Sequence, residues 1–133
     1  MNFADRDGVI WMDGSMVPWR DANVHVLTHS LHYGVGAFEG IRAYKTTQGT
    51  ALFRLDDHVR RLYDTAHILE MKIPFQFDVI REACIDSVRR NSLETAYVRP
   101  LVYYGSEGMG PVSYTHLRAH ETEADLVCRL LLE

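Results

Sequence analysis

Two successive stretches with the helical spacing of apolar residues constrain the fold of this 133-residue chain more than any other feature. The first stretch begins where Asp56 or Asp57 can cap a helix, and it runs to about Glu70. Its expected buried stripe consists of Val59, Leu62, Ala66 and Leu69. On the opposite side, Arg60, Asp64 and His67 are expected to face water.

The second stretch begins after Pro74, which prevents the first helix from continuing. Asp78 can cap this second helix, which is expected to end near Asn91. Its expected inward residues are Val79, Ala83, Cys84 and Val88. Cys84 is expected to pack as a small apolar side chain, and the arginines of this helix to be solvated.

β-prone runs precede the two helices. Asp13 and Gly14 separate the runs from Val9 to Met12 and from Met16 to Trp19, and an Asp-Gly pair in this setting is a strong hairpin signal. A second hairpin is expected from runs 38–44 and 51–54, joined by a polar loop that ends in Gly49.

A further strand is expected after the helices. The run from Thr95 to Tyr104 is rich in β-branched and aromatic residues, and Pro100 within it argues for an edge strand or a bulge. Strands, two helices and a returning strand predict an α+β domain, with the helices on one face of a mostly antiparallel sheet.

Composition is that of an ordinary soluble globular protein, with 47% hydrophobic and 24% charged residues and a formal net charge of −4. The arginines are spread along the chain, which gives no support to nucleic-acid binding. No apolar run approaches the roughly 20 residues of a membrane span, and the polar start excludes a secretory signal. A cytoplasmic location is the expectation.

A dense run of polar and aromatic residues, VHVLTHSLHYGVGAFEGIRAY, extends from Val24 to Tyr44. It contains the strings HSLHYG and FEGIR, and RRLYDTA, AYVRP and GMG follow in order further along the chain. Over about residues 9–110 the chain resembles the small N-terminal domain of the branched-chain aminotransferases, which are fold type IV enzymes that use pyridoxal 5'-phosphate (PLP). Five strings in one order make this resemblance specific.

The resemblance implies roles for individual residues. Arg61 would bind the phosphate of PLP. Tyr33 and Phe38 would form apolar walls of the substrate pocket, with Gly40 leaving room beside them. Tyr97 would hydrogen-bond the substrate carboxylate, and Arg99 would receive the distal carboxylate of glutamate. The remaining expected substrate-site residues are Arg42, Met109 and Gly110.

A homodimer is also implied, because in that family the residue matching Tyr33 is donated across the subunit interface and the turn at Met109 and Gly110 approaches the neighbouring site. The partners would be amino acids and 2-oxo acids. The expected reaction transfers the amino group of leucine, isoleucine or valine to 2-oxoglutarate, as in branched-chain amino-acid biosynthesis.

Several residues keep a second interpretation. The second interpretation of Arg61 is a solvated position on the helix face beside Arg60. Alternation turns Arg42 to the same face as Gly40 and Tyr44, and its second interpretation is a surface arginine of that strand. Glu39 is assigned a structural role, because alternation places it opposite Phe38 and Gly40. No zinc or redox pair of cysteines, glycine-rich nucleotide loop or serine nucleophile elbow is present.

Three histidines could suggest a metal site: His25, His29 and His32. They would share one face only in a helix, whereas residues 24–27 are expected to form a strand, and no cysteine or acidic ligand completes the set nearby. No metal is therefore expected.

The chemistry of the family needs a lysine that forms a Schiff base with PLP. The chain has two lysines, Lys45 and Lys72, and neither stands in a suitable position. We expect residues 1–110 to be the small domain, and residues 111–133 to be a non-family tail from read-through or a frame shift, with a short amphipathic helix from Glu121. The chain by itself is expected to be inactive.

Two other functions stay open from the sequence. One is another fold type IV enzyme, either a D-amino acid transaminase or an aminodeoxychorismate lyase. The other is a non-catalytic module that dimerises or binds an anion.

Overall fold

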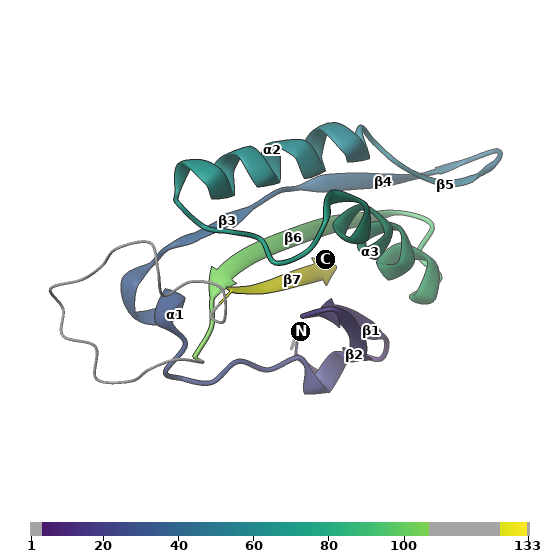
Figure 1. The fold of residues 1–133 in the computed structure, drawn as a ribbon. Coiled ribbons are helices and arrows are strands. Elements are labelled where there is room, and N and C mark those ends of the chain that lie inside the picture. Colours follow the sequence, from purple (N-terminus) through teal and green to yellow (C-terminus); the bar gives the residue numbers. More distant parts are fainter. Residues whose placement is uncertain (1–3, 107–125, 133) are drawn as a thin grey trace, which may run out of the picture.

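A seven-stranded sheet with two helices on one face forms this domain (Figure 1). The computed structural model describes residues 4–106 together with the backbone of residues 126–132. All strand pairs are antiparallel, and the strand order is β2-β1-β7-β6-β4-β5, with β3 also paired to β6. The predicted α+β class, with helices on one face of an antiparallel sheet, is confirmed.

The first hairpin forms as predicted, from β1 (Val9–Met12) and β2 (Ser15–Pro18). Asp13 and Gly14 both have positive φ, at 54° and 94°. This is the backbone of the two-residue turns whose twist matches that of the flanking strands.

The second hairpin differs from its prediction in two ways. The expected first strand is two strands, β3 (Gly36–Phe38) and β4 (Ile41–Thr46), and β5 (Gly49–Leu52) follows a turn of only two residues. Gly49 has φ +115°, which explains why glycine closes this turn.

Strand β6 (Ala96–Tyr104) is central and has neighbours on both sides, so the edge strand predicted from Pro100 is wrong. The register with β3 and β4 is the same on both sides of Pro100, so the alternative, a bulge, is wrong as well. Pro100 lies opposite the gap between β3 and β4. Its carbonyl accepts the N–H of Glu39 at 3.0 Å, but proline has no N–H to return a bond. The ladder is therefore interrupted at this position.

Helix α2 (Leu55–Ile68) buries Val59, Leu62 and Ala66 as predicted. Leu69 follows the last helical residue and is 40% exposed, so its place in the stripe was wrong. The cap was also wrong: Arg54 precedes the helix in the left-handed conformation. The two aspartates stand in the first turn instead, where they complement the helix dipole.

Helix α3 (Phe77–Arg90) packs on the same face of the sheet as α2 (Figure 1). Ala83, Cys84 and Val88 are buried as predicted, and Cys84 is a free buried thiol. Val79 is 43% exposed and Ile80 is fully buried, a difference of one residue in the predicted stripe. Asp78 is the second helical residue and does not cap the helix, which begins after Gln76. No helix of the described residues is long and apolar enough to cross a membrane.

Residues 24–27 do not form the predicted strand. They lie in irregular backbone and a turn that leads into the short helix α1 (His29–Tyr33). The backbone N–H of Leu27 donates to Nδ1 of His25 at 3.1 Å, and the N–H of Thr28 donates to the His25 carbonyl at 2.9 Å. These local bonds compete with strand pairing in spite of the β-branched valines.

The helix predicted from Glu121 is also wrong for the described end of the chain. The backbone of residues 126–132 forms strand β7 (Leu126–Leu132), which pairs with β6 over its whole length and with β1 at Met12. Pairing on both sides satisfies backbone groups of all three strands, which a short isolated helix cannot do.

Candidate functional site

The two faces of the sheet have different surroundings. Side chains alternate along a strand, and Ala37, Ile41 and Val98 belong to the core that the sheet shares with α2 and α3. The opposite face therefore carries the alternate residues of β6 and of the segment 38–44 opposite it. They are Phe38, Gly40, Arg42, Tyr44, Tyr97, Arg99, Leu101 and Tyr103.

Three predicted substrate-site residues meet on this second face. The guanidinium carbon of Arg99 lies 5.2 Å from the ring centroid of Phe38 and 5.3 Å from that of Tyr97. Both distances are in the range of cation–π attraction. Phe38 is 58% exposed, whereas Tyr97 and Arg99 are part-buried, so the Phe38 ring is the exposed part of this cluster.

Gly40 makes this cluster possible. A Cβ atom on Gly40 would lie 2.0 Å from the hydroxyl oxygen of Tyr97 and 2.7 Å from Cζ. The space beside Gly40 is therefore filled by the Tyr97 side chain, which crosses the gap between β3 and β4.

Arg42 lies directly opposite Tyr97 in the β4–β6 register and is exposed. As the alternation predicted, it shares a face with Gly40 and Tyr44. It therefore extends the positive charge of this face next to Arg99.

Arg61 lies on the other side of the sheet, on α2, and contacts Glu39. Its Nε and Nη2 donate to Oε1 and Oε2 of Glu39, each at 2.6 Å. His58, one helical turn earlier, donates from Nδ1 to Oε2 at 2.8 Å. Alternation correctly placed Glu39 opposite Phe38 and Gly40, but neither of its two partners was predicted from the sequence.

The pKa of Glu39 is lowered by this environment. Burial alone raises the pKa of the carboxyl group, but the hydrogen bonds and charges of Arg61 and His58 outweigh burial. The pKa of Arg61 is raised, chiefly by its hydrogen bonds to Glu39. Glu39 is therefore an ionised, buried carboxylate beside an exposed cation.

Tyr33 lies on a different element from the cluster residues. It ends α1, is 62% exposed, and its ring lies edge-on to that of His29 at 6.0 Å. Met109 and Gly110 lie outside the described residues. The structure thus brings together Phe38, Gly40, Tyr97 and Arg99 with Arg42 beside them, and it places Arg61 and Tyr33 at other positions.

The histidines of the dense run make local contacts. His25 accepts from the Leu27 backbone, and Nε2 of His32 lies 2.9 Å from the Val26 carbonyl. Among residues 4–106, histidine, cysteine and acidic side chains form no group of three or more that could hold a metal ion.

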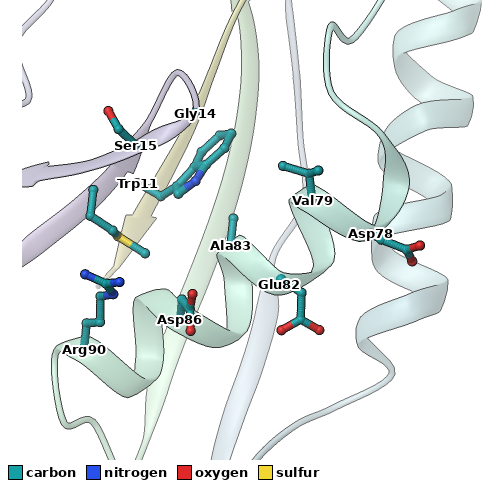
Figure 2. Close-up of a pocket in the computed structure, with 10 residues that line it drawn as sticks. Trp11, Gly14, Ser15, Asp78, Val79, Glu82, Ala83, Asp86 and Arg90 are labelled. Atoms are coloured by element: carbon teal, nitrogen blue, oxygen red, sulfur yellow. The ribbon is translucent and has the colours of Figure 1, made fainter.

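Two hollows of the described surface lie away from these residues. One lies between the β1–β2 hairpin and α3. Figure 2 shows Trp11 on the hairpin side of this hollow and Asp78, Glu82 and Asp86 spaced along the helix. The other lies between β5, the start of α2 and α3. Glu82 and Asp86 pair with Arg81 and Arg89, so these acids form part of a solvated helix face.

Comparison with known proteins identifies a family. The model of the amino-transferase class IV family matches residues 36–129. The branched-chain-amino-acid aminotransferase of Pseudomonas aeruginosa is 64% identical over 110 residues, which are 83% of this chain and 36% of that protein. The Escherichia coli K12 enzyme is 46% identical over 109 residues, 80% of this chain and 35% of that protein.

Solved structures agree. The branched-chain amino acid aminotransferase of E. coli has a TM-score of 0.83 and 38% identity, over 96% of this chain and 41% of that one. The T.th. enzyme, solved with N-(5'-phosphopyridoxyl)-L-glutamate, has a TM-score of 0.81 and 41% identity, over 94% of this chain and 40% of that one. The chain thus spans little more than a third of the length of the curated relatives that it matches.

Proposed function

This chain belongs to the amino-transferase class IV family, and from this premise we propose that it supplies one wall of the site of a branched-chain-amino-acid aminotransferase. The complete protein would transfer amino groups from leucine, isoleucine or valine to 2-oxoglutarate. The observation that carries the proposal is the cluster of Phe38, Tyr97 and Arg99 on the sheet face opposite α2 and α3, where the Phe38 ring is exposed.

The cluster suits a pocket that must accept two kinds of substrate. Branched-chain substrates bring an apolar side chain, whereas glutamate brings a second carboxylate. Phe38 offers apolar surface, and the guanidinium of Arg99 can pair with a carboxylate. When only apolar groups are bound, the same guanidinium stays over the two aromatic rings, which stabilise its charge.

Tyr97 and Arg42 would act beside Arg99. The Tyr97 side chain occupies the space beside Gly40, where a Cβ atom would otherwise lie. Its hydroxyl would hydrogen-bond the substrate carboxylate. Arg42 lies opposite Tyr97 and adds positive charge to this end of the pocket.

The cofactor we propose is PLP, and the available donors fit its phosphate. Arg61 is 66% exposed at its side chain, and its two bonds to Glu39 use Nε and Nη2. Nη1 remains as a donor for phosphate oxygens. When bound, PLP would supply the electron sink that amino-group exchange requires.

The remaining expectations stay proposals. Tyr33, Met109 and Gly110 would belong to a site shared between two subunits in the cytoplasm, and Tyr33 is exposed as this requires. The division of the chain at residue 110 also remains a prediction.

The test compares two half-reactions in the complete natural protein that carries this segment. Replacing Arg99→Gln should lower kcat/KM for glutamate at least about tenfold, equivalent to ~1.4 kcal/mol, and change it for leucine much less. Arg60→Gln is the control, because Arg60 is an exposed arginine of α2 that pairs with Asp57 and lies away from the cluster. Equal losses for both substrates would contradict the assignment, and faster turnover of D-alanine than of leucine would contradict the proposed substrate class.

A further inference from the structure

Glu39 is a charged side chain in a place where charge is costly. Its side chain is 4% exposed, and among the described residues the other buried polar residues are the hydroxyl-bearing Thr28 and Ser87. A buried carboxylate needs partners that satisfy it. Arg61 and His58 provide three donors between them.

The geometry of the pair with Arg61 is side-on. Nε and Nη2 meet the two carboxylate oxygens at equal distances of 2.6 Å, which fixes the plane of the guanidinium. Nη1 and the second hydrogen of Nη2 point away from Glu39. The Arg61 side chain is 66% exposed, whereas the Glu39 side chain that binds it is 4% exposed.

His58 fixes the carboxylate in turn. Its Nδ1 donates to Oε2, the oxygen that also accepts from Nη2 of Arg61. His58 and Arg61 are three residues apart on α2, so one helix face carries both donors. Two side chains therefore bind the Glu39 carboxylate, and it cannot rotate without losing a hydrogen bond to His58 or to Arg61.

A free arginine on a helix surface has many rotamers, and ordering it when a ligand binds reduces affinity. In this structure the Glu39 carboxylate, which is 4% exposed, already holds the Arg61 side chain in one orientation. We propose that Glu39 is a positioning residue, which holds Arg61 with its outer N–H groups directed at a phosphate monoester. This inference rests on the proposed function, since it takes the phosphate to be that of PLP.

The negative charge of Glu39 also repels the phosphate, and this repulsion weakens phosphate binding whereas the orientation of Arg61 strengthens it. The guanidinium stands between the two anions, and repulsion is screened at the exposed end. Orientation is therefore the larger effect, and neutralising Glu39 should weaken phosphate binding.

The experiment measures how much the phosphate group contributes to binding. In the complete natural protein, freed of cofactor, dissociation constants are measured by equilibrium dialysis for PLP and for pyridoxal, which lacks the phosphate. The preference for PLP, defined as the pyridoxal constant divided by the PLP constant, should fall about tenfold in Glu39→Gln, equivalent to ~1.4 kcal/mol. Glu39→Asp, which keeps the charge, should recover part of this preference. Glu94→Gln, at an exposed carboxylate paired with Lys45, is the matched control and should leave it unchanged.

A cycle with Arg61→Ala shows whether Glu39 acts through Arg61. That substitution alone should lower the preference for PLP, and adding Glu39→Gln should lower it no further. If Glu39→Gln weakens the binding of PLP and of pyridoxal equally, or raises the preference for PLP, Glu39 is not a positioning residue. The proposed binding of the phosphate by Arg61 would still stand. If Arg61→Ala leaves the preference unchanged, the phosphate site itself is wrong.

His58→Gln provides a second variant should Glu39→Gln fail to fold. It removes the Nδ1 donor but leaves the ion pair, so the preference for PLP should fall by a smaller factor of about three. An unchanged preference in His58→Gln, with circular dichroism showing a folded protein, would also count against the positioning role.

Discussion

At the scale of single residues, the most restrictive position is Gly40. Its φ is not in the left-handed region, so backbone conformation does not require glycine here. The requirement comes from Tyr97, whose hydroxyl would lie 2.0 Å from a Cβ at this position. The backbone itself must make room for the aromatic ring.

Gly40→Ala is therefore expected to displace the Tyr97 side chain. In the complete protein, KM for amino acid substrates should rise about tenfold or more, equivalent to at least ~1.4 kcal/mol of lost binding. The matched control is Gly36→Ala, whose Cβ would meet the Val102 carbonyl oxygen at 3.2 Å and Tyr103 Cβ at 3.8 Å, so a small shift accommodates it. Steady-state kinetics of both variants decides, and equal KM values would show that Tyr97 does not bind substrate.

The lowered pKa of Glu39 predicts how stability depends on pH. A carboxyl group whose pKa is lower in the folded state stabilises the fold above its unfolded pKa, which is about 4.3 for glutamate. This stabilisation is lost as the pH falls through the still lower folded value. Urea unfolding from pH 6 to pH 3 should show a decreasing free energy of unfolding, with a smaller decrease in Glu39→Gln. A decrease of equal size in that variant would mean that other carboxyl groups cause it.

At the scale of elements, one side chain joins the end of α3 to strand β1. Asn91 Nδ2 donates to the Val9 carbonyl, and Asn91 Oδ1 accepts the Val9 N–H, both at 2.9 Å. Nδ2 also donates to the Ser87 carbonyl at 2.7 Å. Asn91 thus pairs with β1 as a neighbouring strand would.

Asn91→Ala should lower the free energy of unfolding by about 1–3 kcal/mol, because part-buried backbone groups of Val9 lose their partners. Asn91→Asp keeps the acceptor for the Val9 N–H but loses the donor, so it should also destabilise. Asn23→Ala is the control, since Asn23 makes an exposed bond to the Arg20 carbonyl. Urea denaturation monitored by circular dichroism measures all three, and an effect of Asn91→Ala no larger than that of the control would show that this link is weak.

The helices show how far periodicity predicts packing. It located both helices to within about two residues, and three of the four expected inward residues of each are buried. The errors, Leu69 and Val79, lie at helix ends, where the chain leaves the core or has just entered it. Three- and four-residue steps identify a face, but the neighbouring elements decide which end residues that face includes.

At the scale of the whole molecule, the positions of the two lysines decide whether the chain could bind PLP covalently near the cluster around Arg99. Lys45 lies on β4, three residues beyond Arg42 and on the other face by alternation, and its Nζ binds Glu94 at 2.8 Å. Lys72 follows the end of α2. Neither belongs to the cluster around Arg99.

The 133-residue chain is therefore expected not to retain PLP on a specific lysine. Treating the purified chain with PLP and borohydride, followed by peptide mass spectrometry, should find only low and unselective labelling of Lys45 and Lys72. Strong labelling of one of them that phosphate suppresses would contradict this prediction and would place a cofactor site within the chain.

Local sequence was enough to predict the α+β class, the Asp-Gly hairpin, both helices and the face shared by Gly40 and Arg42, because these depend on neighbouring residues and on fixed periods of about 2 and 3.6. The resemblance added the names of the site residues but not their contacts. Tertiary structure decided that Pro100 lies in a central strand, that Tyr97 fills the space at Gly40, and that Glu39 pairs with Arg61, 22 residues away. Such contacts join segments whose separation along the chain carries no period. The pairing of β6 with β3 and β4 brings Tyr97 to Gly40, and the packing of α2 against the sheet brings Arg61 to Glu39.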